Sequence, residues 1–291
     1  ITEEAERYLA ERKGKEKPFF LFLAYNAPHF GKGWSPSDQA PVNIMQPQAA
    51  DLKRVAFIED KIRREFAAMT VSLDDGVGRV LEALERKGLE ENTLVLFTSD
   101  NGGANYIGLP EVNRPFRGWK ITLFEGGIHV PYFAKWPARI APGTEVAVPV
   151  HHFDMYATAA AAAAAAMPDD RKMDGVDLLP FATGEATGVP HEALFWRSGA
   201  SRTAIVNGWK LNVSDPPGRV WLFDLNADPN EQHDLSAERP EKLAELQAAL
   251  AAHNAEQAPP LWPSQISVAI NIDKDLTQPD APDDEYIYWS N

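Results

Sequence analysis

The string Ser99-Asp100-Asn101-Gly102-Gly103 carries the sharpest chemical signal in the sequence. It places a carboxylate and an amide oxygen side by side, directly after an apolar run, and both are hard ligands suited to Ca²⁺ or Mg²⁺. The two glycines allow the backbone to turn tightly around an ion. Asp-Asn-Gly strings are equally typical of turns that end a strand. Asp100 and Asn101 are therefore either two ligands of a divalent cation or turn residues.

Lys120 and His29 are the other residues whose types and positions suggest chemistry. Lys120 lies in a glycine-containing stretch, where an ammonium group can hold an oxyanion as a compact charge. The alternative is an ordinary surface lysine. His29 follows Pro28 and can donate to an anionic or leaving-group oxygen, or it can be a hydrogen-bonded structural histidine.

The composition excludes several classes of protein. The 291 residues contain 28 Lys and Arg against 42 Asp and Glu, a net charge of −14, which argues against a nucleic-acid binder. A few local cations can still bind a small anionic substrate. The absence of cysteine excludes disulfides, cysteine-ligated zinc or iron–sulfur sites and a cysteine nucleophile within these residues. No apolar run approaches the roughly 20 residues of a transmembrane helix.

The candidate residues follow two apolar runs, residues 18–25 and 93–98, which we predict to be buried strands of a parallel sheet. His29 and Asp100 then lie at the carboxyl ends of these strands, where α/β sheets place their ligand sites. Between the runs we expect a long loop over residues 30–50 and a broken helix from Asp51 to Lys87 that stops at Gly88. This alternation indicates an α/β sheet flanked by helices.

The remaining pattern predicts a second, smaller part of the molecule. Four short runs between residues 194 and 224 indicate an antiparallel sheet, and Leu243, Leu246 and Leu250 share one face of a helix near residues 240–255. We therefore predict domains over residues 1–185 and 186–291. Other expected elements are helices at 2–13 and 154–167, a strand at 130–136 and a surface tail at 258–291.

Seven motifs, in this order and spacing, resemble the arylsulfatase-type sulfatases of the alkaline phosphatase superfamily. The resemblance extends from the first apolar run to about Leu250. The motifs are Phe19–His29, Asp75–Leu84, Thr93–Gly102, Gly118–Lys120, Glu125–Pro131, Asp174–Pro180 and Leu222–Glu231.

The resemblance implies an alkaline-phosphatase-like mixed sheet flanked by helices, followed by a small C-terminal antiparallel subdomain with a helix. It implies a sulfuric ester hydrolase that acts on a small-molecule or saccharide sulfate ester with Ca²⁺, or alternatively Mg²⁺. Asp100 and Asn101 match two calcium ligands of the family. His29 matches the histidine at the sulfate group or its bridging oxygen, and Lys120 matches the lysine that holds a sulfate oxygen. Sulfatases of this type are often exported, so the resemblance is compatible with a periplasmic or secreted protein.

One family feature is missing from these residues. The family's nucleophile is a formylglycine made in a Cys/Ser-x-Pro/Ala-x-Arg motif that precedes the Pro-His loop, and an acidic pair on the first strand completes the metal site. Neither precedes His29 here. Two strings imitate them: Asp74-Asp75, which we expect on a helix face, and Ser198-Gly-Ala-Ser-Arg202, which we expect in the C-terminal subdomain. We therefore expect the C-terminal portion of a sulfatase.

Two other functions stay open on the sequence alone. A phosphoester or phosphonate-ester hydrolase of the same superfamily would use similar metal and oxyanion geometry, although Lys120 and the Glu125-Gly-Gly context favour sulfate. A non-catalytic truncated homologue is the second alternative. We interpret the acidic residues Asp224, Asp228 and Glu231 as turn residues.

Overall fold

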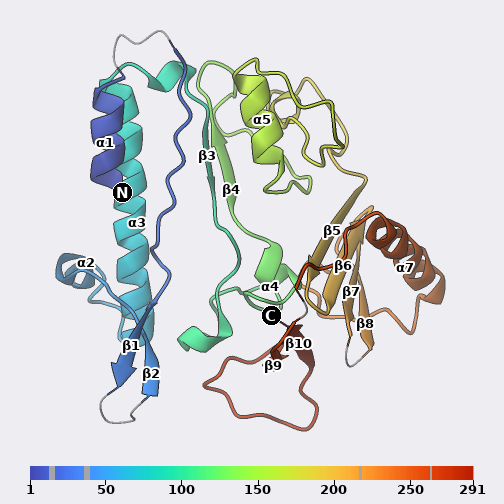
Figure 1. The fold of residues 1–291 in the computed structure, drawn as a ribbon. Helices are drawn as coiled ribbons and strands as arrows, with labels where there is room; N and C mark the ends of the chain where they lie inside the picture. The colour runs from blue at the N-terminus through green and yellow to red at the C-terminus, as the bar shows by residue number, and fades with distance from the viewer. Residues whose placement is uncertain (13–16, 36–39, 216–217, 263, 291) are drawn as a thin grey trace. The chain divides into compact units, whose positions relative to one another are not determined.

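The structure is a computed structural model that describes residues 1–12, 17–35, 40–215, 218–262 and 264–290 (Figure 1). It divides into two compact units. The first unit comprises Ile1–Leu96 and Ala134–Gly188, and the second comprises Phe97–Phe133 and Val189–Asn291. The domain division predicted at residue 185 stays a prediction. No helix within the described ranges combines the length and the hydrophobicity needed to cross a membrane.

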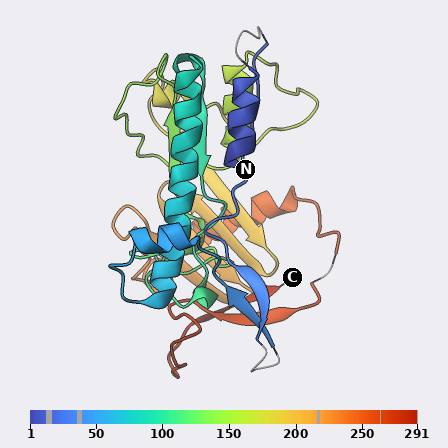
Figure 2. The same cartoon turned by 90° about the vertical axis from the view of Figure 1, so that its left-hand side faces the viewer.

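The first unit is built around a long helix. Helix α1 (Thr2–Ala10) lies along α3 (Lys61–Arg86), and the short α2 (Ala49–Arg54) lies near the other end of α3 (Figure 2). The predicted break in the 51–87 helix is confirmed, because the Asp60 side chain accepts a hydrogen bond from Arg63 N at 2.7 Å and starts α3 as a new helix. Leu9, Ala83 and Leu84 form the buried core between the helices.

Residues 18–25 run extended in this unit but form no strand, and the prediction that both faces are buried is wrong. Phe19 and Leu21 pack against the helix core, whereas Phe20 and Phe22 are 79% and 74% exposed. The alternation is that of a strand with one face covered. No described segment pairs with it, so its backbone has no ladder of hydrogen bonds.

The segment predicted as a long loop contains a β-hairpin. Strands β1 (Gly31–Ser35) and β2 (Ala40–Ile44) pair antiparallel, with Gly31 opposite Ile44 and Ser35 opposite Ala40. Glycine and proline, which usually weaken strands, obscured this hairpin in the sequence.

Strands are confirmed at 93–98 and 130–136 as β3 (Val95–Thr98) and β4 (Tyr132–Lys135), which form a two-stranded sheet. The prediction that the strand at 93–98 is buried is wrong, because all residues of β3 are half-buried. The division between the two units falls within both strands. Helix α5 (Asp154–Ala162) is shorter than predicted, since Ala164 adopts a left-handed φ of 51° that ends the helix. The short elements are η1 (Glu90–Asn92), η2 (Asn105–Ile107), α4 (Glu125–Ile128) and α6 (Leu179–Ala182).

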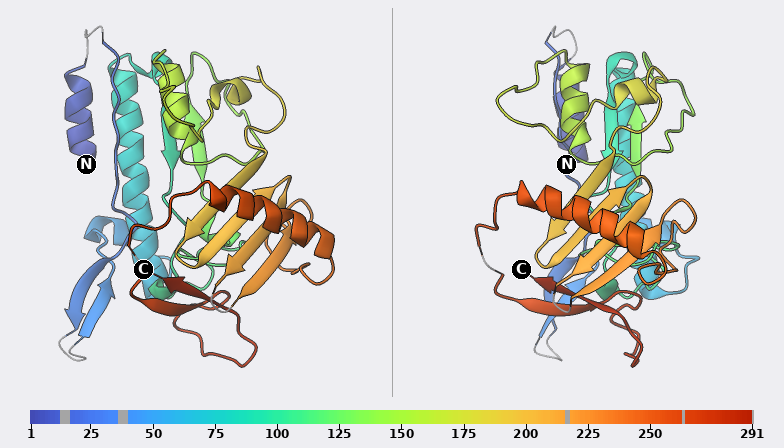
Figure 3. Two further views of the ribbon diagram at one scale, coloured as in Figure 1. Left: turned by 45° about the vertical axis from the view of Figure 1, so that its right-hand side comes forward. Right: turned by 90° about the vertical axis from the view of Figure 1, so that its right-hand side faces the viewer.

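The second unit contains the predicted antiparallel sheet. Its strands pair in sequence order, and α7 (Pro240–Ala255) covers one face (Figure 3). Leu246 and Leu250 of the helix pack against Leu211 and Leu222 of the sheet, which confirms the predicted apolar stripe. The strands are β5 (Ala193–Ser198), β6 (Ser201–Val206), β7 (Trp209–Ser214) and β8 (Arg219–Asp224).

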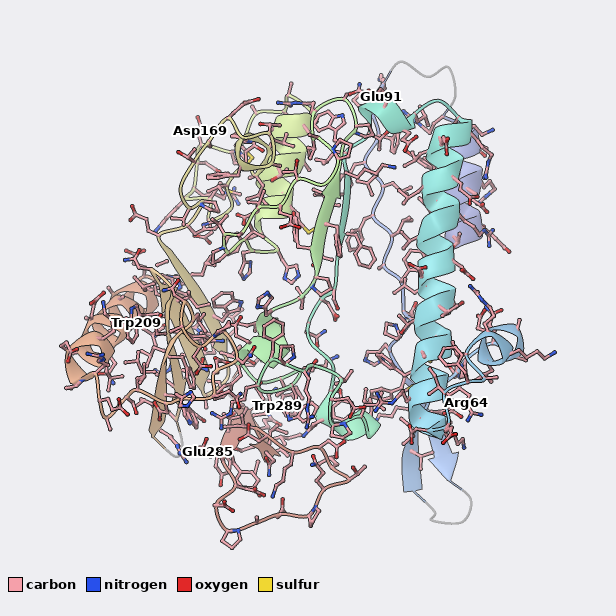
Figure 4. The ribbon with its side chains drawn as sticks, turned by 180° about the vertical axis from the view of Figure 1, so that it is seen from behind. Arg64, Glu91, Asp169, Trp209, Glu285 and Trp289 are labelled. Atoms are coloured by element: carbon pink, nitrogen blue, oxygen red, sulfur yellow. The ribbon has the colours of Figure 1, made fainter. Side chains whose placement is uncertain are left out.

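The C-terminal segment is not only a surface tail, as predicted, but also completes a core. Its strands β9 (Ser267–Asn271) and β10 (Tyr286–Ser290) form a hairpin, on which Trp289 lies, while Trp209 lies beside α7 (Figure 4). The pattern was missed because Pro and Asp residues dominate the 258–291 segment and dilute its short apolar stretches. The buried cluster at this hairpin comprises Phe124, Trp221, Phe223, Ile270, Ile272 and Ile287.

Candidate active site

The loop that follows β3 presents the two predicted metal ligands. Asp100 is exposed and Asn101 is half-buried, and Ser99 Oγ donates a hydrogen bond to the backbone oxygen of Asn101 at 3.0 Å. Within the described ranges, no residue donates to the Asp100 carboxylate or to the side-chain oxygen of Asn101. Both oxygens are therefore available to a hard cation, which is the chemistry that Ca²⁺ requires.

Gly102 fixes this loop against the turn of α4. Its N–H donates to the Gly127 oxygen at 3.0 Å, and a Cβ placed on Gly102 would lie 1.8 Å from the Gly126 oxygen. No side chain larger than hydrogen fits at that distance, so this close approach of two backbones requires glycine. The position of the Asp100–Asn101 loop is thus tied to α4.

The same loop is joined to the segment that carries Lys120. Lys120 N donates to the Gly103 oxygen at 2.9 Å. The Asn113 side chain bridges both segments: its Oδ1 accepts from Gly103 N at 2.6 Å, and its Nδ2 donates to the oxygens of Gly103 and Gly118 at 2.9 and 3.0 Å. In the described part of the chain, nothing accepts a hydrogen bond from the half-buried Lys120 ammonium. The structure therefore joins the Asp100–Asn101 loop to the segment that carries Lys120. The action of the three side chains at one site stays a prediction.

A buried ionic network lies behind the α4 turn. The Lys210 ammonium, fully buried on β7, donates to Glu125 Oε1 at 2.7 Å and to Glu231 Oε1 at 2.9 Å. Glu231 is also fully buried, and its Oε2 accepts from the backbone N–H of Glu125 at 2.6 Å. His129 Nδ1 lies 2.8 Å from Glu125 Oε2, and its ring stacks on Phe116. The network joins α4 to the four-stranded sheet.

The pKa values of the two carboxylates in this network, Glu125 and Glu231, are shifted in opposite directions. Burial alone would raise the pKa of Glu125, but the Lys210 charge and the His129 hydrogen bond outweigh it and lower that pKa to about 2. Burial and the nearby Glu125 charge raise the pKa of Glu231 despite its contact with Lys210. Burial alone would lower the pKa of Lys210, and the two carboxylates raise it. Lys210 is therefore the cation on which both acids depend.

Sequence reasoning missed this network. The turn interpretation is confirmed for Asp224 and Asp228, whose carboxylates accept from the N–H groups of Asn226 at 3.1 Å and of His233 at 2.8 Å. It is wrong for Glu231, which points inward. The available signal was Lys210 between the apolar residues Trp209 and Leu211 of a predicted strand, because a buried ammonium requires buried carboxylates.

His29 lies in the first unit, whereas Asp100, Asn101 and Lys120 belong to the second. His29 is exposed, stacks on Phe30 and holds its Nδ1 2.7 Å from the Phe30 oxygen. Because a carbonyl oxygen only accepts, Nδ1 carries a proton and Nε2 is the nitrogen that remains for another partner. The contact of His29 with a sulfate group stays a prediction.

The two strings that imitate the missing family features lie where they were expected. Asp74 and Asp75 are on α3, and Asp75 pairs with Arg54 through two hydrogen bonds. Ser198 pairs with Ser201 across the tight β5–β6 turn, where Gly199 adopts a φ of 56°. Neither string forms a metal cluster, and no group of three or more His, Asp or Glu residues suited to a metal occurs among the described residues.

Comparison with known proteins decides the family. Residues 1–165, more than half of the chain, match the sequence profile of the sulfatase family. The chain belongs to the sulfatase family. It is 36% identical over 196 residues to "Uncharacterized sulfatase YdeN" of Escherichia coli (67% of this chain, 32% of the relative). It is 31% identical over 303 residues to mouse steryl-sulfatase (89% and 45%). The sulfatase chain thus spans less than half the length of these curated relatives.

Solved sulfatase structures share the fold. The crystal structure of Ps i-CgsB superposes with a TM-score of 0.77 at 29% identity, covering 90% of this chain and 55% of that one. A putative sulfatase from Bacteroides fragilis superposes with a TM-score of 0.62 at 17% identity, covering 87% and 57%. The predicted alkaline-phosphatase-like α/β fold with a small C-terminal antiparallel sheet is confirmed.

Proposed function

We propose that the protein that contains this chain hydrolyses sulfate monoesters. The observation that carries the proposal is the backbone hydrogen bond from Lys120 N to the Gly103 oxygen, because it holds the residue that bears the ammonium group next to the loop of two uncommitted side-chain oxygen ligands. A bound anion would then interact with the Lys120 ammonium and with a metal ion held by Asp100 and Asn101. Sulfate monoesters match this arrangement, since their oxygens carry the negative charge and the bridging oxygen gains more as the ester bond breaks.

Sulfatases generally use a metal ion, often Ca²⁺, to polarise the sulfate oxygens and a formylglycine as nucleophile. Asp100 and Asn101 would supply two of the ligands of such an ion, and the described residues contain no group of three or more His, Asp or Glu residues suited to a metal. Lys120 would hold a sulfate oxygen. His29 would face the sulfate or its bridging oxygen through Nε2, and it donates there only as an imidazolium, because Nδ1 already donates to Phe30.

We further propose a sulfated saccharide or another small sulfate ester as substrate. Related structures support this class. Ps i-CgsB, which is 29% identical to this chain, is also solved in complex with "k-i-k-neocarrahexaose". A relative from dog, 33% identical over 280 residues, is an N-acetylgalactosamine-6-sulfatase. The comparisons do not favour the phosphoester alternative, because the matched family and these relatives are sulfatases.

The experiment is a steady-state assay of the full-length protein encoded by the reading frame that contains this chain. Lys120→Ala is compared with Lys242→Ala, a control on α7 of the same unit whose ammonium pairs with Glu245. Removal of one group that stabilises transition-state charge costs about 10²–10³ in rate. We expect such a loss of kcat/KM on p-nitrophenyl sulfate for Lys120→Ala and none for the control. Equal activity of the two variants would refute the role of Lys120.

A further inference from the structure

The α4 turn is the common support of the two segments that carry the proposed site. Gly126 N donates to the Arg117 oxygen at 2.6 Å, just before Lys120 in the chain. The Gly127 oxygen accepts from Gly102, which follows Asn101 directly, at 3.0 Å. Whatever fixes α4 therefore fixes both segments.

Displacement of α4 cannot be absorbed locally, because its glycines touch both segments backbone to backbone. A Cβ on Gly126 would lie 2.3 Å from the Gly118 oxygen, and one on Gly102 would lie 1.8 Å from the Gly126 oxygen. Such contacts leave no flexible side chain to yield. A shift of the turn would move the Asp100–Asn101 loop and the Lys120 segment with it.

Glu231 is the residue that anchors this turn from the opposite side. Its Oε2 accepts from Glu125 N at 2.6 Å, and its Oε1 accepts from Lys210 Nζ at 2.9 Å and Asn212 Nδ2 at 3.4 Å. Three donors thus hold one fully buried carboxylate. Glu231 also keeps a left-handed φ of 59°, a conformation that costs energy for a residue with a side chain. The fold retains this residue in an unfavourable backbone conformation while its carboxylate reaches α4.

We infer that Glu231 is a positioning residue: by accepting from the Glu125 N–H it sets α4, and through α4 it sets the Asp100–Asn101 loop that would bind the metal ion. The inference rests on the proposed function for its consequence in catalysis. The positioning itself is a property of the second unit. It can therefore be measured without metal or substrate.

The test is amide hydrogen exchange in the 291-residue chain, read at Gly102. Glu231→Met removes both acceptor oxygens at similar side-chain length, whereas Glu231→Gln retains one oxygen for the Glu125 N–H. Leu211→Ala is the control, because Leu211 precedes Asn212 on the same strand but packs against α7 on the other face. The quantity compared is the ratio of the exchange rate at Gly102 to that of the β7 amides. We expect Glu231→Met to raise this ratio at least tenfold and Glu231→Gln to restore most of the protection of Gly102. We expect Leu211→Ala to leave the ratio unchanged.

Two results would overturn the inference. One is unchanged protection of Gly102 in Glu231→Met, and the other is equal loss in the Met and Gln variants, which would show that the retained acceptor is irrelevant. If Glu231→Met does not fold, the unmutated chain decides. The amides of Glu125 and Gly102 must then exchange through one opening with the same urea dependence, and independent opening of Gly102 would contradict the coupling.

Calcium titration of the full-length protein connects the inference to the proposed function. We expect Glu231→Met to weaken Ca²⁺ binding at least tenfold and Glu231→Gln to recover it. Failure of the unmutated protein to bind Ca²⁺ would contradict the proposed function, while the exchange measurement on the metal-free chain would still decide the positioning role. Unchanged Ca²⁺ affinity in a folded Glu231→Met variant would contradict the inference.

Discussion

Replacement of Lys210 by methionine tests the buried network most severely. Methionine matches the length and apolar stem of lysine but lacks the ammonium, so the substitution leaves Glu125 and Glu231 facing each other without their shared cation. Both carboxylates are buried, with Glu231 fully so. Removal of one partner from a buried ion pair costs about 3–5 kcal/mol, since the remaining charge is left in a poorly solvated site.

The matched control is Lys242→Met. The Lys242 ammonium pairs with Glu245 at 2.6 Å on the surface of α7, in the same unit, and surface pairs contribute about 0–1 kcal/mol. The assay is the free energy of opening from urea-dependent hydrogen exchange, read at β7 in the second unit and at α3 in the first. We expect Lys210→Met to lower the opening free energy at β7 by about 3 kcal/mol or more. Equal effects of the two substitutions would refute the claim that the network stabilises this unit.

Three further predictions concern acid stability, association and activity. The pKa of Glu125 is lowered from 4.5 to about 2, so the ionised carboxylate contributes about 3 kcal/mol to the free energy of unfolding. This contribution is present above pH 4.5 and is lost as the pH falls through 2. In urea unfolding, the stability difference between wild type and Glu125→Gln should therefore shrink over that interval. The raised pKa of Glu231 changes the free energy of unfolding with pH in the opposite direction. A stability difference between wild type and Glu125→Gln that does not depend on pH would contradict the lowered pKa of Glu125. Because Phe20 and Phe22 are exposed, we expect the isolated chain to self-associate, and we expect weaker association after both residues are changed to Ser. A monodisperse monomer of the unmutated chain in sedimentation would contradict this. The isolated chain should not hydrolyse p-nitrophenyl sulfate, and turnover that is lost on mutation of Ser198 would overturn that expectation.

The elements that were predictable from the sequence have strong local patterns. The apolar stripe of α7 and the short runs of the β5–β8 sheet carry their own periodicity, so both were located closely. The β1–β2 and β9–β10 hairpins were missed because glycine, proline and aspartate interrupt their short apolar alternation. Cross-strand pairing stabilises these hairpins, and the strand propensity of the single residues does not report it.

The candidate site residues stood out in the sequence for a different reason. Asp100 and Lys120 lie in short strings whose residue types carry chemistry by themselves, and the structure joins the two strings through Gly103. Glu231 was misread because its neighbours Asp224 and Asp228 are turn residues, and the three look alike in sequence. Its burial depends on Lys210, twenty-one positions earlier, and a contact between a strand and a later turn has no local signature.

The central claim is that Asp100, Asn101 and Lys120 belong to a calcium-dependent sulfate ester site. The most direct measurement compares kcat/KM of the full-length protein for p-nitrophenyl sulfate and p-nitrophenyl phosphate, with Ca²⁺, after chelation, and in Asp100→Asn. We predict a preference for the sulfate ester that is lost on chelation, together with a higher Ca²⁺ requirement in Asp100→Asn. Preference for the phosphate ester, or sulfate hydrolysis that neither chelation nor Asp100→Asn affects, would contradict the claim.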